Sequence, residues 1–362
     1  MRAERNERLL VALRELERRF GSWIVYRLRD ARPRVSGPRG DAGAISSGSL
    51  SLDLATGIGG FPRGRIAEVI GPASSGKSVL TFHLLANAQR ERGFVTFIDS
   101  AHRADFEQMA RCGVDLADLF LVVPENVREA LEVASLLVES GGLDALVIGP
   151  LAGLIGDSHR EIWDATARIG RLNLALNASP TAVAFLTDDG AFPSTGPYLR
   201  ALRHAASLRL RVTPRFPLVH PSGDVGGLRV HVETVKNRLA PAQRHTELDL
   251  RRDRGIHSEA DLIDLGLARA VFEERLSGLC FDHTLLGRGR ARAIAALERD
   301  PSLARALRDY LIALPSTLPT PSPGGILAKG VLHAHRLSPI APPVASGRSA
   351  PPPIPAWSAP HH

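Results

Sequence analysis

The run from Gly71 to Ser78, which reads GPASSGKS, constrains this chain more than any other stretch. It fits the pattern G-x-x-x-x-G-K-[ST], in which glycines let the backbone turn so that successive N–H groups point at anionic oxygens. Lys77 is placed to reach the β- and γ-phosphates of a nucleoside triphosphate, and the Ser78 hydroxyl is placed to ligate Mg²⁺. The predicted phosphate site consists of Gly71, Pro72, Ala73, Ser74, Ser75, Gly76, Lys77 and Ser78.

The residues on either side of this loop come in the order that a phosphate loop requires. Residues 65–70, RIAEVI, predict a short apolar strand, and residues 79–88, VLTFHLLANA, predict a helix. Such a helix offers its N-terminus to the phosphates. Strand, loop and helix together predict that the chain binds ATP or GTP.

Composition places weaker limits on the class of protein and on its partners. The 362 residues are 44% apolar and 23% charged, as in an ordinary globular protein with ample core. The net charge of +7 suits a polyanionic partner but is also common among soluble proteins. Cys112 and Cys280 fit no metal or redox spacing and predict buried reduced thiols. The charged N-terminus and the lack of a long apolar run predict a cytoplasmic protein with no membrane partner.

Patterning divides the chain into four parts. Residues 1–36 predict an amphipathic helix and a linker; the apolar stripe of that helix must pack on its own core or on a neighbouring subunit. Residues 37–257 alternate β-rich and helical patterns, which predicts an α/β fold with a mostly parallel sheet flanked by helices. Residues 258–314 predict a small C-terminal α/β lobe. Residues 315–362 hold twelve of the 26 prolines and predict a disordered tail, either a flexible extension or a partner-binding segment.

Several blocks outside the loop resemble the bacterial RecA recombinase family. They include ISSGSLSLDLA at 45–55, GGFPRGRI at 59–66, VKN at 235–237 and LIDLG at 262–266, and the resemblance reaches from the N-terminal helix to about residue 314. It implies a RecA-type P-loop NTPase core that binds ATP and Mg²⁺ between adjacent protomers of a filament on single-stranded DNA. It also implies a role in homologous recombination and DNA repair.

The resemblance assigns further residues by position. It implies that Asp105 faces the adenine, and that Lys236 and Arg238 reach the γ-phosphate across the subunit interface. The N-terminal helix matches the element that packs on the next protomer. Without the resemblance, Lys236 and Arg238 would be interpreted as two solvated cations at the end of a strand.

Two carboxylates that the family uses for hydrolysis are missing here. Ala101 stands in place of the catalytic glutamate that orients the attacking water, and Gly149 stands in place of the Walker B aspartate. Asp144 cannot replace them because it is five residues upstream on the opposite strand face. Asp99 is short and lies two residues before Ala101. No catalytic residue is therefore assigned, and impaired hydrolysis is expected.

Other departures concern the γ-phosphate sensor and DNA. Asp188 stands where the family has a glutamine, and its charge would repel a γ-phosphate unless it binds magnesium. The segment before 156–159 and the segment 188–196 are shorter than the DNA-binding loops of the family, so weakened binding of single-stranded DNA is expected. The candidate DNA contacts are Arg200, Arg203, Arg209, Arg288, Arg290 and Arg292, for which a solvated basic surface is the alternative.

Two hypotheses remain open at this point. One is an ATP-dependent recombinase with eroded but functioning chemistry. The other is a nucleotide-binding RecA paralogue that hydrolyses little and acts as a regulatory or scaffold partner without strand exchange. The loss of both carboxylates favours a recombination or repair protein with impaired turnover. The partners expected are single-stranded DNA and either further copies of the chain or a RecA filament.

Overall fold

The computed structural model describes residues 43–151, 159–189, 196–219 and 223–314. The predicted N-terminal helix, the proline-rich tail, the segment just before residue 159 and most of the segment 188–196 lie outside the described residues. Within them, no helix is both long and apolar enough to cross a membrane.

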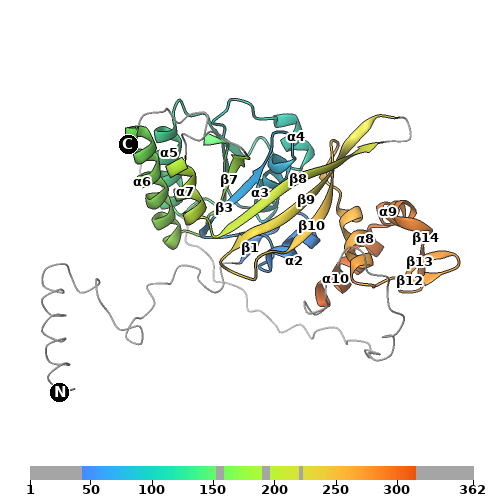
Figure 1. Ribbon diagram of the computed structural model, residues 1–362. Coiled ribbons are helices and arrows are strands. Elements are labelled where there is room, and N and C mark those ends of the chain that lie inside the picture. The colour runs from blue at the N-terminus through green and yellow to red at the C-terminus, as the bar shows by residue number, and fades with distance from the viewer. Residues whose placement is uncertain (1–42, 152–158, 190–195, 220–222, 315–362) are drawn as a thin grey trace, which may run out of the picture. The chain divides into compact units, whose positions relative to one another are not determined.

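Nine strands of the described chain form one mixed sheet (Figure 1). Their order is β11-β10-β9-β8-β3-β7-β6-β4-β5. From β8 to β5 every neighbouring pair is parallel, whereas β9, β10 and β11 are added in antiparallel fashion. The predicted mostly parallel sheet is therefore confirmed. The strands are β3 (Arg65–Gly71), β4 (Val95–Ile98), β5 (Leu119–Val122), β6 (Ala145–Ile148), β7 (Ala182–Asp188), β8 (Leu208–Val219), β9 (Val225–Asn237), β10 (His245–Arg251) and β11 (Gly255–Ile256).

Helices cover both faces of this sheet, which explains why its central strands are continuous apolar runs. In β6, Ala145 and Val147 pack in one cluster with α3 (Lys77–Arg90) and α4 (Phe106–Arg111). The alternate residues, Leu146 and Ile148, pack in a second cluster. Its helices are α5 (Val127–Glu139), α6 (His159–Ala175) and α7 (Gly196–Ala205), followed after α6 by the 3₁₀ turn η2 (Leu176–Ala178).

The C-terminal part of the described chain packs in a third core cluster, which also includes Leu50. The C-terminal part comprises α8 (Ser258–Ala268), a three-stranded sheet, α9 (Gly289–Arg299) and α10 (Pro301–Ala313). The small sheet consists of β12 (Glu273–Arg275), β13 (Gly278–Phe281) and β14 (Thr284–Gly287).

This part is tied to α2 (Leu50–Thr56), which follows the small pair β1 (Ala44–Ile45) and β2 (Phe61–Pro62). The buried Asp261 accepts hydrogen bonds from the Ser49 hydroxyl and the Ser51 N–H. Both cysteines are free and buried, as predicted.

A buried histidine makes the stability of this fold sensitive to acid. His83 in α3 accepts the N–H of Ile256 at Nε2 (2.9 Å), which requires that this nitrogen carries no proton. Burial lowers the pKa of His83 to about 4, and the charge of Arg90 acts in the same direction. Because the folded pKa lies below the unfolded value of 6.5, this contribution to stability is present above pH 6.5 and is lost as the pH falls towards 4.

We expect the free energy of unfolding in urea to fall between pH 7 and pH 4.5 by up to about 3 kcal/mol through this group. His83→Gln should remove that part of the pH dependence, whereas His245→Gln, at an exposed position, should keep it. Equal slopes in the wild type and His83→Gln would contradict the assignment.

Candidate nucleotide site

The phosphate loop joins β3 to α3 and has the backbone that its glycines predict. Gly76 has φ = 86° and caps the helix that begins at Lys77, and Ser74 also has a positive φ of 58°. A Cβ at position 76 would lie 2.3 Å from Cδ1 of Leu250 on β10, so a side chain there would meet both strain and collision. The antiparallel strand β10 thus packs against the phosphate loop through Leu250.

The loop offers donors that the protein leaves unused. The Ser75 N–H donates to the Pro72 carbonyl, and the Val79 N–H donates to the Gly76 carbonyl. Among the described residues, no backbone carbonyl accepts from the N–H groups of Gly76, Lys77 or Ser78. These groups lie at the N-terminus of a 14-residue helix, where an anion is favoured. The buried Ser75 hydroxyl also has no partner. The residues present therefore fit the phosphates of a nucleotide.

Lys77 is held from two sides. Its ammonium donates to the Pro72 carbonyl (3.0 Å) and pairs with Oδ1 of Asp188 (2.8 Å). Asp188 is the last residue of β7 and lies opposite Gly71 in the parallel register with β3. The carboxylate that the sequence places near the terminal phosphate thus contacts the lysine that would bind that phosphate.

A side chain at Gly149, the position after β6, would make close contacts with the end of β4. A Cβ at Gly149 would lie 2.9 Å from the Ser100 hydroxyl and 3.1 Å from the Ile98 carbonyl. The Ser100 hydroxyl in turn donates to the Pro150 carbonyl (3.0 Å), so it cannot move away without losing that bond. Ala101, in contrast, is exposed.

The two aspartates nearest to these positions are engaged elsewhere. Asp99 accepts hydrogen bonds from the N–H groups of Arg103 (3.1 Å) and Ala104 (2.9 Å), which closes the loop after β4. Asp144 pairs with Arg63 (2.9 Å) at the start of β6, the end opposite to Gly149. Both carboxylates therefore have partners within the protein.

This chain is similar to known proteins over most of its length. The RecA N-terminal domain family matches residues 7–174. A protein named Protein RecA from Herpetosiphon aurantiacus is 32% identical over 357 residues, covering 94% of this chain and 96% of that protein. The chain belongs to the RecA family. Protein RecA from Streptomyces venezuelae is 36% identical (83% of this chain, 82% of that protein), and Protein RecA from Thermus thermophilus is 34% identical (83% and 92%).

Two of the three residues that the RecA family resemblance assigns outside the loop, Asp105 and Lys236, have side-chain partners within this subunit. Asp105 is exposed and caps α4, since its carboxylate accepts the Gln108 N–H (2.8 Å). The Lys236 ammonium donates to the carbonyls of Arg203 (2.5 Å) and His204 (3.1 Å) at the end of α7. Burial, with the charges of Arg238 and Arg209, lowers the pKa of Lys236 to about 8. These carbonyls use two of the three donors of the Lys236 ammonium, so a partner across a subunit interface would compete with them.

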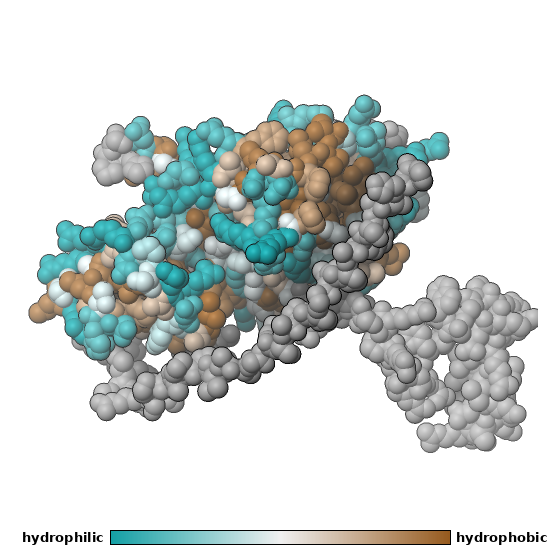
Figure 2. Space-filling model, turned by 180° about the vertical axis from the view of Figure 1, so that it is seen from behind, coloured by the Kyte–Doolittle hydropathy of each residue, from teal (hydrophilic) through white to brown (hydrophobic). Residues whose placement is uncertain are grey.

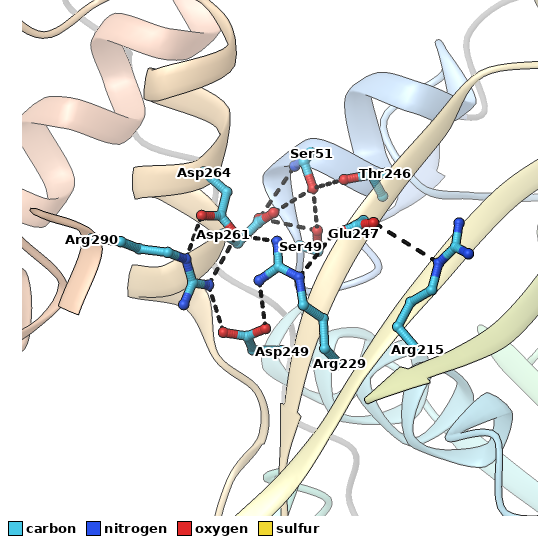
Figure 3. A network of polar contacts seen from close by, with 10 residues as sticks. All are labelled: Ser49, Ser51, Arg215, Arg229, Thr246, Glu247, Asp249, Asp261, Asp264 and Arg290. Atoms are coloured by element: carbon cyan, nitrogen blue, oxygen red, sulfur yellow. Dashed lines mark hydrogen bonds and ion pairs between the residues drawn. The ribbon is translucent and has the colours of Figure 1, made fainter. Parts of the chain in front are cut away.

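Two of the six candidate DNA contacts pair with carboxylates inside the protein, and a third, Arg288, donates to the Leu276 carbonyl (2.7 Å). Arg209 pairs with the fully buried Glu68 (2.5 Å), and Arg290 pairs with Asp249 (2.5 Å) and Asp264 (2.6 Å) (Figure 3). The guanidinium groups of Arg209 and Arg290 bind carboxylates of the protein itself, so the prediction of DNA contact rests on the remaining candidates. Those exposed arginines are Arg200, Arg203, Arg288 and Arg292.

The network around Arg290 was missed by the sequence reasoning. Its centre is Arg229 on β9, which binds Glu247, Asp249 and Asp264 at 2.8–2.9 Å (Figure 3). It joins β9 and β10 to α8 and α9, and so holds the C-terminal part against the main sheet. A signal was present in the sequence LDL at 248–250, where an acid lies between two buried leucines.

Proposed function

We propose that this chain is a RecA-like protein of homologous recombination or DNA repair that binds nucleotide and DNA but hydrolyses ATP slowly or not at all. The observation that carries the proposal is the contrast within one site. The phosphate loop is complete and has unused N–H donors, whereas position 149 is glycine and position 101 is alanine. The relatives named Protein RecA support the recombination and repair role.

In this proposal the N–H groups of the loop and the Lys77 ammonium hold the phosphates of ATP. The Ser78 hydroxyl ligates Mg²⁺, which neutralises phosphate charge when the nucleotide is bound. No described carboxylate near the carboxyl ends of β4 and β6 is free to orient water, because Asp99 is bound to its own loop. Positioned acid–base groups contribute about 10²–10⁴-fold in rate, so their loss makes turnover marginal.

Surface features support the expected partners. Apolar side chains gather on the face seen from behind (Figure 2). At the sheet edge, the side chains of Phe94, Phe120, Leu121 and Val123 are exposed on and beside β5, whose outer side pairs with no described strand. An exposed apolar sheet edge is suited to pairing with another chain. We propose that this edge serves assembly with further copies or with a RecA filament, and that the exposed arginines contact single-stranded DNA.

A second candidate is a regulatory or scaffold partner of a RecA filament that has no strand-exchange activity. The loss of both carboxylates favours it, since a partner of this kind needs to hold nucleotide but not to turn it over. Both candidates share the same nucleotide site and differ in whether the protein itself exchanges strands.

The test is equilibrium nucleotide binding by the wild type and Lys77→Ala, together with ATP turnover with and without single-stranded DNA. We expect binding that Lys77→Ala weakens at least tenfold, because the ammonium contacts the phosphates directly. Turnover should stay near background in both conditions. DNA-stimulated turnover that Lys77→Ala abolishes would refute impaired hydrolysis. Absence of binding by the wild type would refute the nucleotide site.

A further inference from the structure

Asp188 pairs with Lys77, the lysine that would bind the terminal phosphate of a nucleotide. β7 lies directly beside β3, and the parallel register pairs Asp188 with Gly71. Asp188 is therefore at the end of the sheet where the phosphate loop begins. Its Oδ1 lies 2.8 Å from the Lys77 ammonium. The Lys77 side chain is only 8% exposed, whereas that of Asp188 is 45% exposed, so the carboxylate lies on the solvent side of the lysine.

Lys77 has few ways to bind a terminal phosphate while this pair persists. An ammonium has three donors, and two of those of Lys77 already serve the Pro72 carbonyl and Asp188, which leaves one for a phosphate. The lysine of a phosphate loop reaches the β- and γ-phosphates, and the γ-phosphate is the group that distinguishes ATP from ADP. A second anion brought to the same ammonium would be repelled by Asp188.

Among the described residues, Lys77 is the only cation that pairs with Asp188. The neighbouring Asp189 is itself acidic and lies 3.8 Å from Arg211, and its N–H donates to the Gly71 carbonyl. Positions 101 and 149 supply no carboxylate that would hold a metal ion between the two anions.

From this geometry we infer that the site selects nucleoside diphosphates over triphosphates, and that Asp188 is the residue that discriminates between them. The inference rests on the proposed nucleotide-binding function and specifies the ligand of that site. A protein of this kind stays bound to the diphosphate even where the triphosphate is present at a comparable concentration.

The test is equilibrium binding of ADP and of ATP, in the presence of EDTA, to three proteins: the wild type, Asp188→Asn and Asp189→Asn. We expect the wild type to bind ADP at least tenfold more tightly than ATP. Asp188→Asn should reduce that ratio to about threefold or less, since asparagine can still accept a hydrogen bond from Lys77 but carries no charge. Asp189→Asn removes the same charge one residue along and should keep the ratio.

Each other outcome has a defined meaning. The same ratio in the wild type and Asp188→Asn would overturn the inference and leave nucleotide binding intact. Binding of neither nucleotide by any of the three proteins would overturn the proposed site and the inference with it. With Mg²⁺ in place of EDTA, ATP binding that is stronger in the wild type than in Asp188→Asn would mean that Asp188 holds the metal against the γ-phosphate. That result would also overturn the inference. Retained ADP binding shows that each variant is folded.

Discussion

Ala101→Glu is expected to raise the rate of ATP hydrolysis about 100-fold over the wild type at saturating ATP. Position 101 follows the carboxyl end of β4 and is exposed, so a longer side chain has room there. A carboxylate at this position restores the group that the RecA family resemblance assigns to orienting the attacking water. The expected gain lies at the lower end of the 10²–10⁴ range for positioned acid–base groups because Gly149 still supplies no carboxylate.

The matched control is Ala101→Gln, which has nearly the same shape but cannot accept a proton. Release of inorganic phosphate should rise in Ala101→Glu and stay at the wild-type level in Ala101→Gln. Adding Lys77→Ala to Ala101→Glu should abolish the gain, which shows that the turnover belongs to this site. An equal rise with glutamine and glutamate, or no rise with either, would contradict the view that the missing carboxylate limits hydrolysis.

Arg229→Ala is expected to lower the free energy of unfolding by about 3–5 kcal/mol. The Arg229 side chain is 13% exposed and binds three carboxylates, of which Asp249 is 4% exposed (Figure 3). Its removal leaves Glu247, Asp249 and Asp264 clustered with Arg290 as their main remaining cation in the drawn network. Breaking a buried pair by removing one partner leaves an uncompensated charge, which is why the effect is large.

Urea unfolding at neutral pH measures this loss. Arg215→Ala is the control, because Arg215 is 47% exposed and approaches the same network only through Glu247, at 3.9 Å. It should cost less than about 1 kcal/mol. A loss in Arg229→Ala no larger than that in Arg215→Ala would show that the network contributes little to holding β9 and β10 against α8 and α9.

The sequence predicted those elements of secondary structure that are determined by a local pattern of apolar residues. Alternating apolar runs and helical patterns predicted the mostly parallel sheet, because each central strand is covered on both faces and so reads as a continuous apolar run. The strand before the phosphate loop and the helix after it were predicted for the same reason. The DNA-contact prediction for Arg290 shows the limit, since a run of arginines does not reveal that Asp249 and Asp264 lie beside one of them.

The phosphate loop could be predicted from sequence alone because its pattern lies in a few consecutive residues, and the resemblance to the RecA family implies the loss of carboxylates at Ala101 and Gly149. Only the tertiary structure decided which partners those residues have. Lys77 meets Asp188 because β7, far away in the chain, lies in parallel register beside β3. Asp99 binds N–H groups of its own loop, which is a local contact, but Gly149 lies against Ser100 because β4 and β6 are neighbours in the sheet. Partners of this kind depend on which strands lie side by side, and that order is set by packing of the whole chain.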